Sequence, residues 1–519
     1  MTLSGIKTWL PSDVRKQEFV TSKLIALYEA AGCEPIVIPT LVDMSVVEKA
    51  NSKFNSEIFK LVDKDGKVLA LRTEMTQPIA KAVASRASEL SFPLKLYYNS
   101  TIFRYKGIAT DDSREIQQIG VEFIGAQAES SDKEILELLI KSATELGIKD
   151  YQITITVASI WQQIFSKFPS VGKQVYDLIR KGDLIGFKNL IPENHALRTL
   201  LSDDISKLEQ SLDLDLSSVK SLLSLGAMIK FDALQCPDIG LYTGLHFNLI
   251  VAGQGKLLAM GGRYDNLCKE FGEDLPAVGF AFYVPRLIST MISQGLLTPS
   301  LRGAPEARRG NPSMIEKTLK IAVSKGTLLD GAIEFLGKNG ISVETGDKRK
   351  LILDASPGLG FDKIEILLVR GHDVPTYVEH GAADLGVVGV DTVIDSKTNV
   401  IRLKDLDYGH CKLCVCAKQG LYKSLTELPN YTRVATTFPN ITKDFFDKRG
   451  LEIEIINLYG SVELGPLTEL SDIIVDLVAS GKTLEENGLE VISEIMPCSA
   501  ILIANEASFK VYKDKFLML

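Results

Sequence analysis

The sequence has few cysteines, no long apolar run and no excess of positive charge, and each shortage excludes a class of protein. Seven Cys among 519 residues are too few for a disulfide scaffold, and their number is odd, so we expect free thiols in a reducing cytoplasm. No stretch reaches the roughly 18 apolar residues that a membrane-spanning helix needs. Residues 1–15 lack the pattern of a signal peptide. We therefore expect a cytoplasmic protein without membrane contact.

The charge balance is slightly acidic. The 58 Lys and Arg against 66 Asp and Glu leave a formal net charge of −8. That sign argues against non-specific nucleic-acid binding, which needs a basic face, but it permits small phosphorylated ligands held by a few cations. The 45% of hydrophobic residues is typical of globular protein, and 40 Gly with 19 Pro exclude a coiled-coil rod.

A segment rich in helix breakers divides the chain. Residues 297–318 combine Pro, Gly, Ser and Arg without a sustained apolar period, which is typical of a linker. The sequence therefore predicts one domain over residues 1–296 and another over 319–519.

The two predicted domains differ in pattern. The first has a helical spacing over 12–30, and residues 94–103, 115–124 and 244–251 are rich in the aromatic and β-branched residues of an antiparallel sheet. In the second, strands and helices alternate, which predicts an α/β fold with a largely parallel sheet.

The clearest ligand site lies in the second domain. A buried apolar strand runs into the turn 479–483, and a helix follows. Gly481 lets backbone N–H groups approach a ligand, and the helix N-terminus adds donors, so the turn predicts a phosphate seat. Thr483 and Glu486 predict a capping box. Asp476 excludes a nucleotide P-loop, because that motif needs Gly there, and an ordinary strand-turn-helix is the alternative.

Cations follow two other strands of this domain, those over 319–324 and 364–369. Strand ends are where open α/β sheets hold ligands, and a ligand with several phosphates needs several fixed cations. Scattered surface bases are the alternative. The cations and glycines concerned are Lys325, Gly326, Arg349, Arg370 and Gly371.

Residues 319–519 resemble the short form of ATP phosphoribosyltransferase, the first enzyme of histidine biosynthesis. The resemblance rests on AVSKGTLLD, LLVRGHDVPTYVEHGAADLGVVGVD and LYGSVELGPLTELSDIIVDLVASGKTLEENGL, which follow one another along nearly the whole segment. It implies two lobes of the periplasmic-binding-protein type with the site in the cleft. It also implies that N1 of the ATP adenine attacks C1 of phosphoribosyl pyrophosphate and displaces pyrophosphate, with Mg²⁺ accompanying the substrates.

The resemblance assigns roles to residues by motif. The groups that face the pyrophosphate or the ATP phosphates would be Lys325, Gly326, Arg349, Arg370 and Gly371. Of these, Lys325, Arg349 and Arg370 would be catalytic residues. The groups that hold phosphoribosyl pyrophosphate would be Glu463, Asp476, Ala479, Ser480, Gly481, Lys482, Thr483 and Leu484.

The first domain carries an amino-acid-binding pattern in three segments, LRTEMT at 71–76, TIFR with QQIGVE at 101–122, and LYTG with GGRYD at 241–265. Gln118 and Glu122 alternate with apolar residues, so both point to one face of a strand. A buried carboxylate there needs a partner, and an amine or imidazolium would serve. A polar sheet face open to water is the alternative.

These segments resemble histidyl-tRNA synthetase, a class II synthetase, and more closely its paralogue, the regulatory subunit of ATP phosphoribosyltransferase. The synthetase arginine that assists adenylate formation aligns with Pro237, and Gly240 and Leu241 replace an Asp and a Tyr. The resemblance therefore implies histidine binding rather than aminoacylation. The pocket would be lined by Glu74, Thr76, Arg104, Gln118, Glu122, Tyr242 and Tyr264.

A metal site made of the chain's own side chains is not expected. The Cys-rich segment 410–416 lacks paired C-x-x-C spacing, and its period of two indicates a strand.

The sequence thus predicts a fusion. An α+β domain of the class II aminoacyl-tRNA synthetase type, with an antiparallel sheet, precedes an α/β two-lobed transferase of the periplasmic-binding-protein type. We expect a homo-oligomer, with a tetramer favoured, and feedback by histidine. The alternatives are a histidyl-tRNA synthetase with an appended domain and a non-catalytic histidine sensor.

Overall fold

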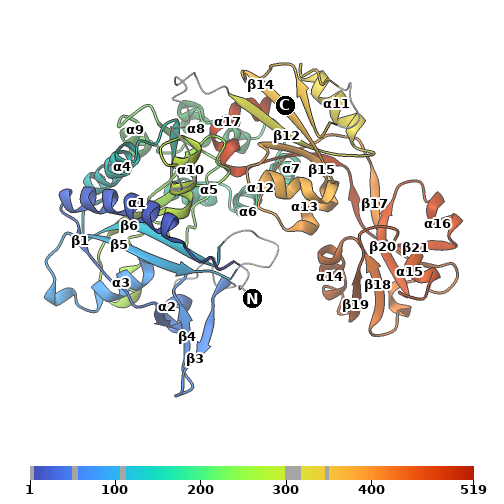
Figure 1. The fold of residues 1–519 in the computed structure, drawn as a ribbon, viewed down its shortest axis with the longest axis horizontal. Helices are drawn as coiled ribbons and strands as arrows, with labels where there is room; N and C mark the ends of the chain where they lie inside the picture. The colour runs from blue at the N-terminus through green and yellow to red at the C-terminus, as the bar shows by residue number, and fades with distance from the viewer. Residues whose placement is uncertain (1–4, 50–56, 106–112, 299–316, 345–349) are drawn as a thin grey trace. The chain divides into compact units, whose positions relative to one another are not determined.

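The chain forms two compact units (Figure 1). One comprises Met1–Arg180 and Leu190–Asn311, and the other comprises Lys181–Asn189 and Pro312–Leu519. The computed structural model describes residues 5–49, 57–105, 113–298, 317–344 and 350–519. The predicted linker lies almost wholly outside these ranges, so the predicted domain boundaries stay a prediction. Within the same ranges, no helix has the length and apolar character that crossing a membrane requires.

The first unit is built on an eight-stranded sheet in the order β1-β5-β6-β11-β10-β9-β7-β8. All pairs are antiparallel except the two at the edges, β1 with β5 and β7 with β8. The strands are β1 (Glu34–Pro35), β5 (Leu94–Phe103), β6 (Glu115–Ile124), β7 (Tyr151–Val157), β8 (Ile229–Phe231), β9 (Leu245–Val251), β10 (Ala259–Arg263) and β11 (Ala277–Tyr283). The three strands predicted from the sequence are confirmed to within one residue.

Helices cover one face of this sheet. Tyr28 of α1 packs its ring 6.3 Å from those of Tyr97 and Phe280, which point to that face. Helices α1 (Pro11–Ala30), α4 (Ala128–Glu145) and α10 (Val284–Ser293) lie there. Because side chains alternate along a strand, Glu122 of β6 points to the opposite face, whose β5-β6 end is covered by α3 (Thr76–Ala84).

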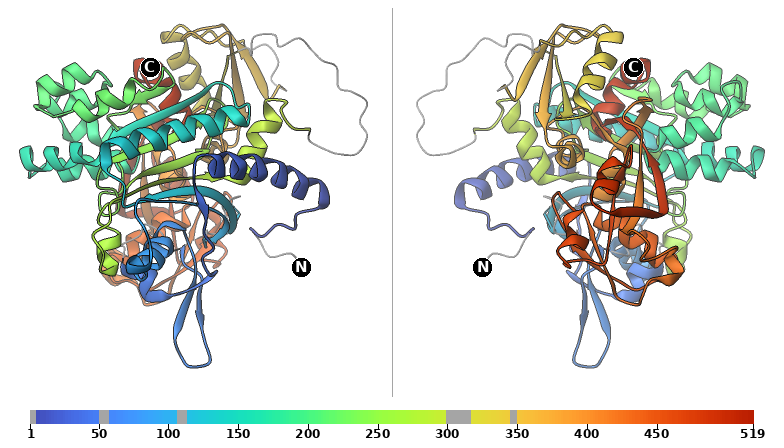
Figure 2. Two further views of the ribbon diagram at one scale, coloured as in Figure 1. Left: turned by 90° about the vertical axis from the view of Figure 1, so that its left-hand side faces the viewer. Right: turned by 90° about the vertical axis from the view of Figure 1, so that its right-hand side faces the viewer.

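Smaller elements complete the first unit. A three-stranded sheet of β2 (Leu41–Asp43), β4 (Val68–Leu71) and β3 (Lys60–Val62) carries a hairpin that projects from the unit (Figure 2). The remaining helices are α2 (Met44–Lys49), η2 (Ala87–Glu89), α5 (Ala158–Lys167), α6 (Gly172–Arg180), η3 (Ala196–Leu201), α8 (Ile205–Leu212), α9 (Ser217–Leu223) and η4 (Cys268–Phe271), while α7 (Leu184–Leu190) falls largely within the segment grouped with the second unit.

The second unit has two lobes, each with its own sheet. The first lobe has the strand order β13-β14-β12-β15-β22-β16 and the second has β19-β18-β20-β17-β21. The strands are β12 (Thr318–Ser324), β13 (Ile352–Ala355), β14 (Lys363–Val369), β15 (Leu385–Gly389), β16 (Ile401–Asp405), β17 (Cys411–Lys418), β18 (Thr432–Thr436), β19 (Ile453–Asn457), β20 (Ile473–Val478), β21 (Leu489–Cys498) and β22 (Ala500–Ala504).

Each sheet has three parallel strands at its core, β14-β12-β15 and β19-β18-β20, with antiparallel strands beside them. The prediction of a largely parallel sheet is therefore wrong in extent. The reason is that the chain passes into the second lobe through β17 and returns through β21 and β22, and these strands pair antiparallel with their neighbours. The two-lobed α/β class is confirmed, and its likeness to periplasmic binding proteins stays a prediction.

Short connectors join the lobes, residues 406–410 in one direction and Ser499 in the other. Tyr408 in the longer connector donates a hydrogen bond to the Leu328 carbonyl, 3.0 Å away. A Cβ added at Gly331 would stand 2.3 Å from the nearest atom of this ring, so the ring occupies the space that a side chain there would need.

Helices surround both sheets of the second unit. They are α11 (Leu329–Lys338), η5 (Gly371–Asp373), α12 (Val374–Glu379), α13 (Val390–Ser396) and α17 (Glu506–Met518) in the first lobe, and η6 (Leu425–Glu427), α14 (Pro439–Asp447), α15 (Leu464–Leu467) and α16 (Lys482–Glu486) in the second.

Candidate functional site

The predicted phosphate seat is a tight turn between β20 and α16. Gly481, at φ +77°, stands directly before the helix in the left-handed region that glycine tolerates best. The predicted capping box is wrong, because the turn is closed by Gly481 and Thr483 lies inside α16 without a side-chain cap. Ser480, Lys482 and Thr483 are exposed, whereas Leu484 is buried and anchors the helix.

Two carboxylates lie together beside this seat. Asp476 stands on β20, and one of its oxygens accepts the Leu477 N–H at 2.8 Å. Burial, together with a smaller contribution from the negative charge of Glu463, raises the pKa of Asp476 to about 6. The structure thus brings together the two acidic residues that the sequence placed in the phosphoribosyl pyrophosphate site.

The predicted cations of the first lobe adjoin one another at the carboxyl ends of two paired strands. The Lys325 N–H bonds to the Val369 carbonyl at 2.9 Å, so the turns after β12 and β14 run side by side. Lys325 and Arg370 are both exposed, and Gly326 and Gly371 lie in the same turns. The third predicted cation, Arg349, lies outside the described residues.

In the first unit, Glu122 is the centre of a buried polar cluster. Its side chain is 2% exposed, and its two oxygens accept hydrogen bonds from Tyr264 and, at 3.3 Å, from Thr76. Burial, together with a smaller contribution from the charge of Glu74, raises the pKa of Glu122 to about 8 against the lowering effect of these two bonds. The predicted trio of Thr76, Glu122 and Tyr264 is therefore in direct contact.

The other predicted pocket residues surround this cluster. Gln118 lies four residues before Glu122 on the same face of β6 and is 5% exposed. Arg104 donates to the Thr73 carbonyl at 3.0 Å, so it holds the segment that carries Glu74. Burial raises the pKa of Tyr242 strongly, and the charge of Glu74 adds to that effect.

The sheet beside this cluster contains residues that the sequence analysis missed. Glu122, Gly279, Gly262 and His246 follow one another across four paired strands. A Cβ at Gly279 would stand 1.8 Å from a Glu122 oxygen, and one at Gly262 would stand 2.7 Å from the Tyr242 ring. Glycine therefore makes room for both side chains. Glycines within strands are the signal that could have found them.

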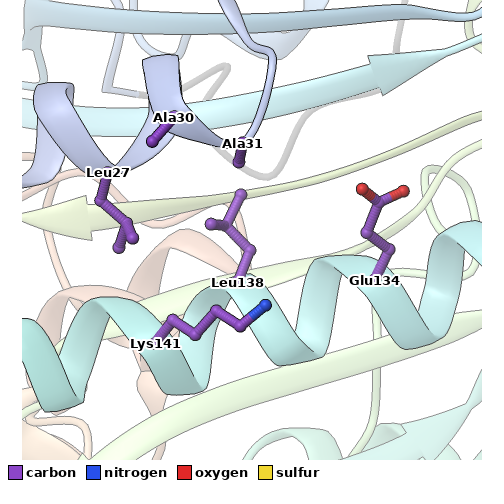
Figure 3. A pocket seen from close by; sticks show the side chains of 6 residues that line it. All are labelled: Leu27, Ala30, Ala31, Glu134, Leu138 and Lys141. Atoms are coloured by element: carbon purple, nitrogen blue, oxygen red, sulfur yellow. The ribbon is translucent and has the colours of Figure 1, made fainter.

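A shallow hollow of about 160 Å³ lies on the helix-covered side of the first unit, between α1 and α4 (Figure 3). It is lined by Leu27, Ala30, Ala31, Glu134, Leu138 and Lys141. None of these is a predicted site residue.

The described ranges contain no group of three or more His, Cys, Asp or Glu placed to hold a metal ion. The Cys-rich segment forms strand β17, as its alternation predicted. All seven cysteines lie within the described ranges and carry reduced thiols.

Two family models match the chain, one described as Histidyl-tRNA synthetase over residues 5–287 and one described as ATP phosphoribosyltransferase over residues 370–519. The ATP phosphoribosyltransferase of Caldanaerobacter subterraneus is 45% identical over 199 residues, which are 38% of this chain and 91% of that protein. That of Campylobacter concisus is 44% identical over 203 residues, 39% of this chain and 95% of that protein. The chain belongs to both families.

A solved structure shows the fold of the first family. It is described as an ATP phosphoribosyltransferase regulatory subunit/histidyl-tRNA synthetase from Bacillus halodurans C, and it matches with a TM-score of 0.51 and 24% identity over 65% of this chain and 89% of that chain. The fusion predicted from the sequence is thus confirmed. The class II synthetase-like fold and the membership of an ATP phosphoribosyltransferase family are confirmed with it.

Proposed function

We propose that the chain joins N1 of the ATP adenine to C1 of phosphoribosyl pyrophosphate, releasing pyrophosphate and giving N1-phosphoribosyl-ATP, the first step of histidine biosynthesis. The similarity of about 200 residues to enzymes named ATP phosphoribosyltransferase carries this proposal. The turn at Gly481 beside Asp476 and Glu463 supports it, because it joins backbone phosphate donors to acceptors for ribose hydroxyls.

Each lobe of the second unit is assigned a different part of the substrates. In the second lobe the turn 479–484 holds the 5-phosphate, and Asp476 with Glu463 faces the ribose. In the first lobe Lys325, Arg370 and Arg349 neutralise the departing diphosphate, while Gly326 and Gly371 let the backbone approach the ATP phosphates. Alignment and charge stabilisation then suffice without a covalent nucleophile.

Mg²⁺ is expected to arrive with the substrates. The oxygen donors of Asp476 and Glu463 fit a hard cation that keeps most of its ligands from phosphates and water. Such an ion would supply charge stabilisation to the diphosphate.

The first unit is proposed to bind histidine and to regulate the transferase. The cluster of Glu122, Thr76 and Tyr264 offers oxygen acceptors to a positively charged group, and Glu74, Arg104, Gln118 and Tyr242 complete its surroundings. Feedback requires that histidine bind two states of the chain with different affinity. We further propose a cytoplasmic homo-oligomer, with a tetramer favoured.

One assay tests the transferase. ATP, phosphoribosyl pyrophosphate and Mg²⁺ are mixed with the full chain, and the ultraviolet absorbance of N1-alkylated adenine is followed. We expect a change that requires all three and that is lost in Arg370→Ala. A folded chain that gives no change would favour the histidine sensor, and charging of histidine tRNA would favour the synthetase.

A further inference from the structure

Two cysteines face each other where the lobes of the second unit join. Cys411 is the first residue of β17, and Cys498 is the last residue of β21. They are direct partners in the antiparallel pair of these strands. Each stands beside a connector to the first lobe, residues 406–410 before Cys411 and Ser499 after Cys498.

The two thiols are close enough to react with one another. They form a side-chain hydrogen bond, which lowers the pKa of Cys411 and, with burial, raises that of Cys498. Partners in an antiparallel pair have Cα atoms about 4.5–5.5 Å apart, within the about 4.4–6.8 Å that a disulfide spans. Cys498 is 4% exposed, whereas Cys411 is half-buried, so Cys411 is the thiol that a reagent reaches first.

The geometry points to a modification site: we propose that Cys411 and Cys498 form a reversible disulfide between β17 and β21, at the point where these strands meet the two connectors between the lobes. The oxidant is an external disulfide. The Cys411 thiolate attacks it and releases one thiol, and the Cys498 thiolate then displaces the second. One S–S bond forms and the external S–S bond is reduced to two thiols, which take up the two protons that the cysteines lose.

The cross-link has a mechanical consequence. The two connectors are the covalent links between the lobes, so any change of the angle between the lobes must occur at them, and a disulfide beside both of them adds a covalent restraint to the strand pair from which they emerge. If the lobes close on two substrates, as the proposed function requires, the oxidised chain turns over more slowly. Only this last step rests on the proposed function, since disulfide formation is read out without substrates.

The experiment treats the full, folded chain with 4,4′-dithiodipyridine and maps disulfides by non-reducing peptide mass spectrometry. We expect a Cys411–Cys498 peptide that retains no thiopyridine, and two thiopyridones released for the pair. We also expect a fall in transferase turnover of about tenfold, which dithiothreitol reverses. Cys411→Ser and Cys498→Ser should each abolish both the peptide and the reversible loss.

Cys236→Ser is the matched control, since Cys236 is also half-buried but lies in the first unit, and it should leave the cross-link intact. Absence of the Cys411–Cys498 peptide at full reagent consumption would overturn the site, and a cross-linked chain with unchanged turnover would overturn its effect on the lobes. A reduced chain without any turnover would contradict the proposed function, while the peptide map would still decide the cross-link.

Discussion

At the scale of single residues, Glu122 is a carboxyl group that the fold keeps protonated at neutral pH. Its pKa of about 8 means that binding a positive ligand must release a proton, so affinity for histidine should rise as the pH increases from about 7 to about 8.5. Glu122→Gln should remove this rise and weaken binding by about tenfold or more, because bonds to charged groups contribute about 1.5–3 kcal/mol. Calorimetric titration at several pH values checks both; an unchanged pH profile in the variant would refute the assignment.

Asp476 makes a second residue-scale prediction. Its carboxylate is charged above its pKa of about 6 and neutral below, so kcat/KM for phosphoribosyl pyrophosphate should fall as the pH drops through about 6. Asp476→Asn should lower kcat/KM by about tenfold or more at neutral pH and abolish this fall. Asp472→Asn is the control, since the Arg433 guanidinium lowers the pKa of Asp472. A fall near pH 6 that survives in Asp476→Asn would assign the titration to another group.

At the scale of elements, the turn before α16 depends on backbone freedom. Gly481 and Gly488 flank this helix, both have positive φ, and a Cβ at either meets nothing within 4 Å. Alanine at either should therefore cost about 1–2 kcal/mol through strain alone. Only Gly481→Ala should also raise the KM for phosphoribosyl pyrophosphate, and Gly481→Asn should recover part of the loss. Equal KM values for the two alanine variants would show that the turn does not hold the phosphate.

The elements also show what local pattern can and cannot predict. Strands β5 and β6 were predicted with their observed bounds, because both segments are rich in aromatic and β-branched residues. The capping box at Thr483 failed because the choice of cap depends on the left-handed turn at Gly481. Motifs along the sequence predicted the site residues. Motifs did not predict that Gly279 pairs with Glu122, or that Cys411 pairs with Cys498, because these pairs depend on strand register, which joins segments far apart in sequence.

At the scale of the whole molecule, two compact units should unfold as two transitions, since each has its own core. A hundredfold excess of ligand over Kd should add about 2.7 kcal/mol to the free energy of unfolding of the unit that binds it, so histidine should raise the midpoint of one transition and phosphoribosyl pyrophosphate that of the other. Scanning calorimetry with each ligand separately is the measurement. A single transition that both ligands move equally would show that the units unfold together.

The hydrogen bond from Tyr408 to Leu328 ties a connector between the lobes to the loop that carries Lys325. Tyr408 belongs to a connector between the lobes, and Leu328 lies three residues beyond Lys325. If the lobes close on both substrates, as the proposed function requires, the connector would therefore shift the loop that carries Lys325. On the proposed role of Lys325, charge stabilisation of the leaving diphosphate would then depend on both substrates being bound, and either substrate alone would leave the lysine out of place.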